Sequence, residues 1–309
     1  MPRALYRKYR SKSLSEIVGQ DHVTDILSRA LSQGKIAHAY LLTGPRGVGK
    51  TSIARILAHE INQLTYAEDT NHLDIIEIDA ASNNGVEDVR DLREKVQIAP
   101  VAAKKKIYII DEVHMLSKAA FNALLKTLEE PPEHAVFILA TTDVEKLPAT
   151  IISRTQRFHF RSITPNDAMK HLRHIAAEEN IAIDDDALEL IARHGDGSFR
   201  DSISLLDQLS SLAADSTITK ELAQQVLGLA PEEKVKDILK AHEAKDLALL
   251  ITLLKESEES GVQASALAQQ LMLYIRNHIV ETPQFLPLLD KLLEVAKSSQ
   301  PAVKLLTAL

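Results

Sequence analysis

The residues best suited to chemistry form the motif GPRGVGKT, which follows an apolar run at 39–42 and precedes a helical pattern at 53–57. This order indicates a strand, a glycine-rich loop and a helix. Glycines in such a loop let backbone N–H groups converge on one small volume, and the start of the helix adds the positive end of its dipole. A simple glycine turn would explain the glycines but not the Lys-Thr pair. We therefore predict that a nucleotide's phosphates bind at Gly44, Pro45, Arg46, Gly47, Val48, Gly49, Lys50 and Thr51.

A pair of acids forms the second chemical landmark. Asp111 and Glu112 come directly after the apolar run at 107–110. Lys50 would reach the terminal phosphates, while the Thr51 hydroxyl and Asp111 would bind Mg²⁺, directly or through water. Glu112 would orient and deprotonate the attacking water, which is the general-base task of phosphoanhydride hydrolysis. An acidic pair at a strand end is common by itself, but behind a phosphate loop it indicates an ATP-hydrolysing site.

Further polar side chains are candidates for contacts with the nucleotide. Thr141 or Thr142, after the apolar run at 135–140, would hydrogen-bond the γ-phosphate or the water, or else cap a turn. Arg154 and Arg200 are candidates for stabilising charge on the transferred phosphoryl group, from the same chain or a neighbour, although either alone would more often form a surface ion pair. The basic N-terminal segment is either a solvated arm or a segment whose tyrosines, Tyr6 and Tyr9, lie over an adenine ring.

Short apolar runs alternate with amphipathic patterns up to residue 164, which predicts an α/β fold with a parallel sheet covered on both faces. We expect the strands at 39–42, 73–78, 107–110 and 135–140. We expect helices at 14–31 and 86–96, and another that Ser117 caps and Pro131 stops. Because ligands bind at the carboxyl ends of parallel strands, the phosphate loop and both polar strand ends should share one crevice.

No strand pattern appears after residue 164. The sequence predicts helices at 165–179, 184–194, 198–212 and 219–227, and a separate helical bundle beyond Pro231. Three acids at 184–186 could suggest a metal site, but acids in the first turn of a helix more often compensate its dipole. We interpret them in that second way.

Bulk properties narrow the function classes. A net charge of −7 over 309 residues excludes a globally basic nucleic-acid binder and confines any DNA contact to a patch. The absence of cysteine excludes disulfides and thiolate metal sites. No apolar run approaches the ~18 residues of a membrane span, so we expect a cytoplasmic protein with no membrane partner.

The combined motifs closely resemble those of the ATPase subunits of bacterial sliding-clamp loaders, the gamma/tau family of DNA polymerase III. The resemblance is dense from about Arg3 to Leu229 and rests on GPRGVGKT, DIIEIDAASNNGVEDVR, IYIIDEVHMLSKAAFNALLKTLEEPPEH, ILATTD, SRT and GSFRDSISLLDQ. It implies an AAA+ module at 1–164, a three-helix lid domain at 165–229 and an all-α collar at 230–309. It also implies ATP-driven opening of the clamp and its loading on primed DNA.

The resemblance implies roles for single residues. The stretch Gly44 to Thr51 would be the Walker A motif, and Asp111 with Glu112 the Walker B motif. Thr142 looks like the sensor-one residue, and Arg200 like the lid arginine that acts on its own ATP. Arg154 looks like the finger offered to the next subunit's ATP. The implied partners are other clamp-loader subunits, in a hetero-pentamer or a homo-oligomer joined through the collar, together with the sliding clamp and primer-template DNA.

The sequence departs from the family pattern at two places. Family members usually carry a four-cysteine zinc module where this chain has only 61–73, without cysteine, so we predict no zinc; His59 and His72 are more simply solvated. The family's Ser-Arg-Cys motif here reads Ser-Arg-Thr, which keeps the arginine. DNA contacts by resemblance would fall near 83–85 and at Ser117 and Lys118.

Two other functions share parts of this pattern. A structural clamp-loader subunit that does not hydrolyse ATP should have a degenerate phosphate loop, whereas Lys50, Thr51, Asp111 and Glu112 are all present. An AAA+ branch-migration or remodelling motor shares the phosphate loop and an arginine finger, but the DEVHMLS string and the Ser-Arg motif favour the clamp loader. A P-loop kinase would need an acceptor pocket, for which the sequence gives no signal.

Overall fold

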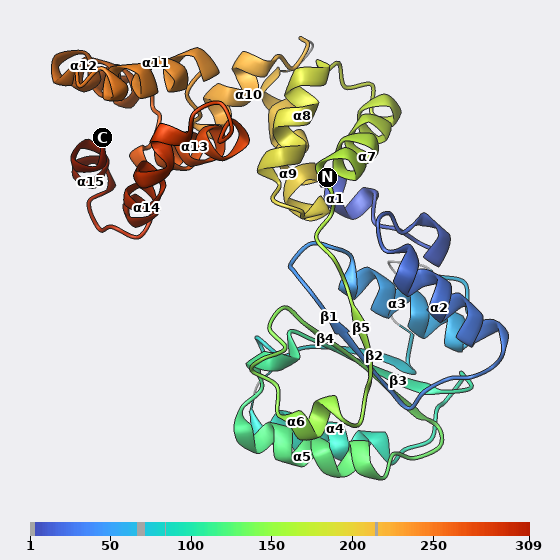
Figure 1. Ribbon diagram of the computed structural model, residues 1–309. Helices are drawn as coiled ribbons and strands as arrows, with labels where there is room; N and C mark the ends of the chain where they lie inside the picture. The colour runs from blue at the N-terminus through green and yellow to red at the C-terminus, as the bar shows by residue number, and fades with distance from the viewer. Residues whose placement is uncertain (1–3, 67–71, 84, 214–215) are drawn as a thin grey trace. The chain divides into compact units, whose positions relative to one another are not determined.

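The computed structural model describes residues 4–66, 72–83, 85–213 and 216–309. The chain forms two compact units: the first contains Met1–Glu178 and Ile191–Asp207, and the second contains Glu179–Leu190 and Gln208–Leu309. Figure 1 labels the elements of both. The finer division into three domains, with boundaries after residues 164 and 229, stays a prediction.

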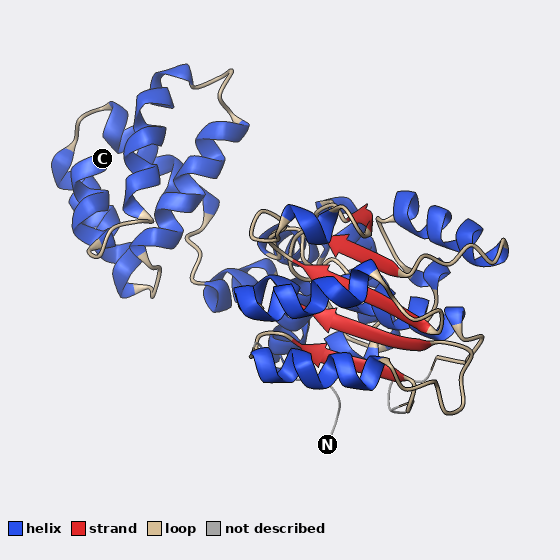
Figure 2. Cartoon of the chain, turned by 90° about the horizontal axis from the view of Figure 1, so that it is seen from below, coloured by secondary structure: helices blue, strands red, loops and turns tan. Residues whose placement is uncertain are grey.

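The first unit is built on a five-stranded parallel sheet with the strand order β2-β3-β4-β1-β5. Figure 2 shows its arrows running the same way. The strands are β1 (Ala39–Thr43), β2 (Ile75–Asp79), β3 (Lys106–Asp111), β4 (Ala135–Thr141) and β5 (Gln156–His159). The four predicted strands are confirmed. The edge strand β5 was not predicted, because an edge strand needs only one buried face, and in this strand only Phe158 is buried.

Helices cover both faces of this sheet (Figure 1). One side has α2 (Asp21–Ser32) and α3 (Lys50–Ile61), and the other has α4 (Val86–Val96), α5 (Lys118–Glu129) and α6 (Ala149–Ile152). The core on the second side includes the stacked rings of Tyr108 and Phe137, with centroids 5.5 Å apart, and the buried side chains of Leu124, Leu128 and Ile151. The Ser117 hydroxyl accepts the Ala120 N–H at 3.2 Å, which confirms the predicted cap of α5.

The predicted helix over 14–31 is wrong in its first half. A short 3-10 turn, η1 (Leu14–Glu16), is followed by a break at Gly19, whose φ of +74° lies in the left-handed region. Next to it, the buried Gln20 amide donates to the Arg161 carbonyl at 2.8 Å and accepts the Arg161 N–H at 3.1 Å. This pairing with a distant segment outweighs the local helical pattern, so α2 begins only at Asp21.

The remaining elements of the first unit lie near the carboxyl ends of the strands. They are α1 (Leu5–Lys8), η2 (Val113–Met115), α7 (Pro165–Glu178) and the first half of α9 (Phe199–Ala213). The helices predicted at 165–179 and 198–212 are thereby confirmed to within one residue at each end.

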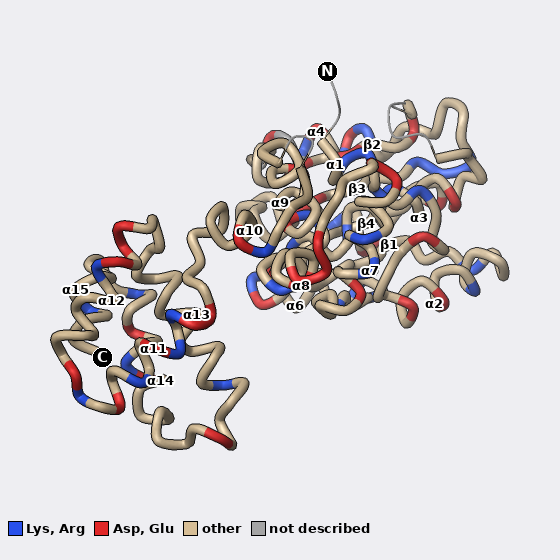
Figure 3. The backbone as a smooth tube through the Cα atoms, turned by 90° about the horizontal axis from the view of Figure 1, so that it is seen from above, with Lys and Arg blue, Asp and Glu red and all other residues tan. Residues whose placement is uncertain are grey.

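The second unit is entirely helical apart from one isolated bridge between Ile183 and Ile218, over its described residues. Its core includes Ile238, Leu271, Ile275 and Leu292, all buried. Figure 3 shows basic and acidic residues interspersed along the backbone of each unit. Each described helix of the chain is too short or too polar to cross a membrane. The helices, in chain order, are α8 (Asp185–His194), which begins in this unit, the second half of α9, α10 (Lys220–Leu227), α11 (Glu232–Glu243), α12 (Leu247–Glu259), α13 (Ala264–Asn277), η3 (Pro283–Phe285), α14 (Leu286–Val295) and α15 (Pro301–Ala308).

Candidate nucleotide-binding site

The phosphate loop joins β1 to α3, as the sequence predicts. At two positions of the loop only glycine fits, because a Cβ would clash with a neighbouring segment and the backbone has a positive φ. Gly44 has φ +141°, and a Cβ there would meet the backbone of Phe160; Gly47 has φ +73°, and a Cβ there would meet the Ser198 side chain. Phe199 N–H donates to the Gly47 carbonyl at 3.0 Å, so the start of α9 is fastened to the loop. The loop is therefore packed tightly on the side of α9.

Lys50 lies in the first turn of α3 with only 5% of its surface exposed. Its ammonium group donates to the carbonyl oxygens of Gly44 at 2.8 Å and Pro45 at 2.5 Å. Burial lowers the pKa of Lys50, while the nearby charges of Glu112 and Asp111 act in the opposite direction. The cation is thus held against the inner wall of the phosphate loop.

The Thr51 hydroxyl donates to Asp111 Oδ2 at 2.7 Å, although the two residues lie 60 positions apart in the chain. Burial raises the pKa of Asp111, whereas the hydrogen bonds from Thr51 and from the Glu112 N–H oppose that rise. A hydroxyl and a carboxylate oxygen at this distance are the hard donors that Mg²⁺ prefers, so the pair fits a magnesium site. The predicted meeting of the phosphate loop with the end of β3 is confirmed.

Glu112 leaves the strand in the left-handed conformation, with φ +47°. Its Oε2 accepts the Thr142 N–H at 3.2 Å and the Thr142 hydroxyl at 3.0 Å. The same oxygen lies 3.3 Å from Nδ1 of His114, whose side chain is almost buried. Of the two threonines that sequence analysis left open, Thr142 is therefore the one that contacts Glu112, while the buried Thr141 hydroxyl bonds to the Asp143 carbonyl and the His114 ring.

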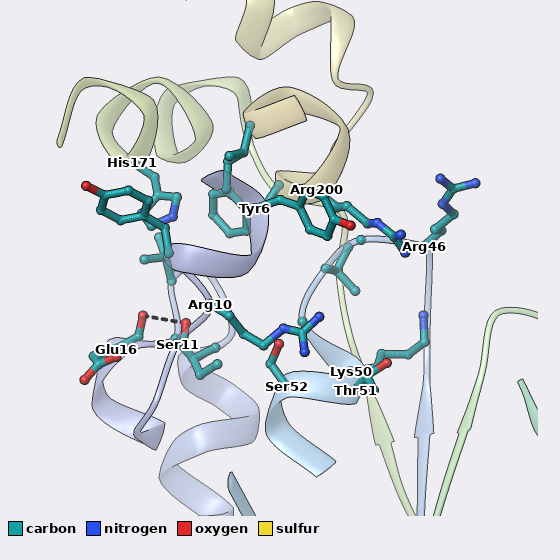
Figure 4. Close-up of a pocket in the computed structure, with 18 of the residues that line it drawn as sticks. Tyr6, Arg10, Ser11, Glu16, Arg46, Lys50, Thr51, Ser52, His171 and Arg200 are labelled. Atoms are coloured by element: carbon teal, nitrogen blue, oxygen red, sulfur yellow. Dashed lines mark hydrogen bonds between the residues drawn. The ribbon is translucent and has the colours of Figure 1, made fainter. Parts of the chain in front are cut away.

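Lys50, Thr51, Asp111 and Glu112 border a cavity of about 510 Å³ (Figure 4). Thr141 and Thr142 are not among the described residues that line it, so the end of β4 reaches this crevice only through the contact of Thr142 with Glu112. Its walls come from the phosphate loop, the end of β3, the N-terminal segment, the middle of α7 and the start of α9. Arg200 lies with its guanidinium carbon 5.1 Å from the centroid of the Tyr6 ring, and Arg46 on the rim lies 3.5 Å from Asp201. The lining residues that bear on the predictions are Tyr6, Tyr9, Arg46, Gly47, Val48, Gly49, Lys50, Thr51, Asp111, Glu112 and Arg200.

Several residues that line the cavity were not predicted from the sequence. His171 on α7 and Phe199 on α9 pack edge to face, with ring centroids 4.9 Å apart, and burial lowers the pKa of His171. Phe199 adjoins Arg200 in the GSFR string, which offered a signal for it. His171 has no such signal, because it lies in an ordinary amphipathic helix that only the tertiary fold brings to the cavity.

Arg154 lies away from this cavity, outside the set of described residues that line it. Its guanidinium pairs instead with Glu129 at 2.7 Å. The predicted DNA-contact stretch at 83–85 is only partly described, since Asn84 lies outside the described residues, and that prediction stays open.

The interpretation of His59 as a solvated side chain is wrong, because this residue is buried, whereas His72 is half-buried. Both histidines have contacts. His59 Nδ1 lies 2.8 Å from the Arg55 carbonyl, and His72 Nδ1 accepts the Asp74 N–H at 3.1 Å. Over the described residues, no group of three or more metal-ligating His, Asp or Glu side chains occurs. That the chain binds no zinc stays a prediction.

Comparison with known families gives two matches along the chain. The family described as "DNA polymerase III, delta subunit" matches residues 19–164, and the family "DNA polymerase III clamp loader subunit, ATPase lid domain" matches residues 168–214. Among solved structures, the Holliday junction branch migration motor RuvB of Thermotoga maritima is similar, with a TM-score of 0.58 over 85% of this chain and 91% of that chain. At 24% identity this likeness shows the fold alone, which is the AAA+ P-loop fold.

Curated relatives are more similar in sequence. The tau subunit of DNA polymerase III from Bacillus subtilis is 43% identical over 292 residues, which are 90% of this chain and 52% of the relative. The gamma subunit from Buchnera aphidicola is 39% identical over 298 residues, 92% of this chain and 82% of the relative. The chain thus spans about half the length of the first of these relatives and most of the second. It belongs to the gamma/tau family of DNA polymerase III clamp-loader subunits.

Proposed function

We propose that this chain is the ATPase motor subunit of a replicative clamp loader, which uses ATP binding and hydrolysis to open a sliding clamp and load it on primed DNA. The observation that supports this most is the complete set of Lys50, Thr51, Asp111 and Glu112 around one cavity. A purely structural subunit would have no use for a buried lysine and two acids at a phosphate loop.

In this proposal the phosphates of ATP enter the phosphate loop and take over the Lys50 ammonium from the carbonyl oxygens of Gly44 and Pro45. An anionic oxygen is a stronger acceptor than a neutral carbonyl, so the exchange favours binding. The left-handed glycines turn the loop N–H groups toward the same volume. A Mg²⁺ ion held by Thr51 and Asp111 would supply neutralising charge to the phosphate oxygens.

Glu112 is the proposed general base. Its carboxylate borders the cavity while Thr142 holds one of its oxygens, which leaves the other oxygen to accept a proton from the attacking water. Thr142, the proposed sensor, acts through this contact and would exchange it for one to the water or the γ-phosphate. Arg200 would act on the phosphates of the same chain, and Tyr9 in the N-terminal wall would contact the base.

Arg154 is proposed to act on the ATP of a neighbouring subunit, which agrees with its position outside the cavity of its own chain. The proposed assembly joins several subunits through the collar at 230–309, with a lid domain at 165–229 closing over the AAA+ module at 1–164. Its partners would be other clamp-loader subunits, the sliding clamp and primer-template DNA. Because bacterial DNA is replicated in the cytoplasm, we propose that location.

The test measures ATP binding and turnover of the assembled complex, with and without clamp and primed DNA. Lys50→Ala should abolish ATP binding, whereas Arg154→Ala should leave binding intact and slow hydrolysis only in the assembled ring. Stimulation of the wild-type turnover by clamp and primed DNA together supports the loader function. Turnover that neither component changes, or unwinding of branched DNA by the complex, would instead favour a remodelling motor.

A further inference from the structure

The side chain of Arg154 is held by its own chain at several points. Nη2 donates to Glu129 Oε1 at 2.7 Å, and Nη1 donates to the Thr150 carbonyl at 2.9 Å and to the Ser153 hydroxyl at 3.2 Å. A guanidinium has five N–H donors. Over the described residues these contacts use both hydrogens of Nη1 and one of Nη2, so the Nε–H and the second Nη2 hydrogen remain available to an outside acceptor.

Glu129 occupies a position that its own helix does not favour. It is the last residue of α5 and is followed by Glu130 and two prolines. The carboxyl end of a helix carries partial negative charge, so acids there are unfavourable and cations are preferred. The placement of a carboxylate at this helix end therefore needs another explanation, and the contact with Arg154 provides one.

The separation between the two side chains is fixed by the core. Leu128, directly before Glu129, and Ile151, which precedes Arg154 in the short α6 turn, are both buried in the same hydrophobic cluster beneath the sheet. Close-packed interiors allow little relative movement of such anchors. The carboxylate is thus presented to the guanidinium by two rigidly seated helix ends.

We propose that Glu129 is the positioning residue of Arg154, fixing its guanidinium in the orientation that reaches a neighbouring subunit's ATP. This inference rests on the proposed action of Arg154 on that ATP. A long, flexible side chain loses rotamer entropy when it is immobilised on binding. Because Glu129 already orders the guanidinium, this entropy is lost when the subunit folds and not when the neighbour binds.

The pair is suited to testing because it adds little to the stability of the fold. The Arg154 and Glu129 side chains are 33% and 48% exposed, and ion pairs at that exposure contribute little to folding. Replacement of Glu129 should therefore leave a folded chain. Glu130 is the matched control, since it is an adjacent, exposed glutamate at the same helix end.

The experiment mixes two variants of the full chain in the assembled complex. The receiver is Arg154→Ala, which can bind ATP but offers no finger; the donor is Lys50→Ala, which offers the finger but binds no ATP. Hydrolysis should appear only when the two are mixed. Glu129→Gln in the donor should lower kcat about 3-fold and Glu129→Ala about 10-fold, as expected for losing one immobilised side chain, with the receiver's affinity for ATP unchanged.

Two comparisons make the result specific. Glu130→Gln in the donor should leave kcat unchanged, and Glu129→Gln added to the receiver, where Arg154 is already absent, should cause no additional loss. Full activity of both Glu129 variants as donors would overturn the inference while leaving the proposed function in place. A mixture that shows no complementation even with intact Glu129 would count against the action of Arg154 on a neighbour's ATP, and so against the inference too.

Discussion

Replacing Asp74 by asparagine should destabilise the first unit without touching the nucleotide site. Asp74 is fully buried just before β2, and its carboxylate accepts three backbone N–H groups of the loop before β3. Val101 donates to Oδ1 at 2.7 Å, while Ala102 and Ala103 both donate to Oδ2 at 2.8 Å. This carboxylate therefore fastens the backbone of the loop before β3 to the start of β2.

The size of the destabilisation by Asp74→Asn can be worked out from these three hydrogen bonds. An asparagine oxygen in the place of Oδ2 keeps two bonds, but its NH₂ group then faces the Val101 N–H, so one bond is lost. Hydrogen bonds to a charged group contribute about 1.5–3 kcal/mol each, and those to a neutral group about 0.5–1.5 kcal/mol. A neutral amide is also easier to bury than a carboxylate, which offsets part of the loss. We therefore expect the free energy of unfolding to fall by roughly 3 kcal/mol. For a unit of this size that is a fall in Tm of about 9 °C.

The pH dependence gives an independent check. Burial alone would raise the pKa of Asp74, but the backbone hydrogen bonds from Ala102, Val101 and Ala103 and the nearby His72 bring it below its usual value. A group with a lowered native pKa stabilises the fold above its unfolded pKa, near 3.9, and this contribution is lost as the pH falls through the native pKa. The stability difference between wild type and Asp74→Asn should therefore shrink below about pH 4.

Scanning calorimetry of the full chain between pH 3 and pH 7 measures both effects, with Asp25→Asn on the exposed face of α2 as the control for removal of one negative charge. At pH 7 the Tm of Asp74→Asn should be lower than that of the wild type, and the difference should become smaller toward pH 3. If Asp74→Asn melts together with Asp25→Asn at every pH, the reasoning about the buried carboxylate is refuted.

Three further predictions concern the site and its support. Gly47→Ala should lower ATP affinity at least 10-fold by calorimetric titration, because the methyl group would meet Ser198 and force a left-handed alanine costing about 1–2 kcal/mol; unchanged affinity would contradict the packing argument. Glu112→Gln should retain ATP binding and lose turnover by about 100-fold or more, since only the proton acceptor is removed; wild-type turnover would exclude Glu112 as the base. Arg55 makes a bidentate ion pair with Glu77, with hydrogen bonds of 2.6 and 2.7 Å. A double-mutant cycle measured by urea unfolding should give a coupling energy of about 1 kcal/mol between them. Additive effects of the two single substitutions would show that the pair does not contribute to stability.

The sequence predicted most of the sheet and the chemistry at its carboxyl ends, because these depend on local patterns and one topological rule. Thr51 and Asp111 meet since parallel strands bring their ends together, and the motif spacing anticipated that contact. The remaining walls of the cavity were harder to foresee. The contact of Tyr6 with Arg200 and the placement of His171 depend on packing between segments far apart in the chain, for which the sequence offers no period or spacing.

The left-handed turn at Glu112 separates two acids that adjoin in the chain. Asp111 faces the helix after the phosphate loop, whereas Glu112 faces the neighbouring strand β4, where Thr142 holds it. Since the backbone conformation and separate hydrogen-bond partners set these directions, neutralising Glu112 should leave Asp111 facing Thr51. A single substitution at Glu112 should therefore give a complex that retains nucleotide and metal but stalls before bond cleavage, which would allow the nucleotide-bound state to be imaged.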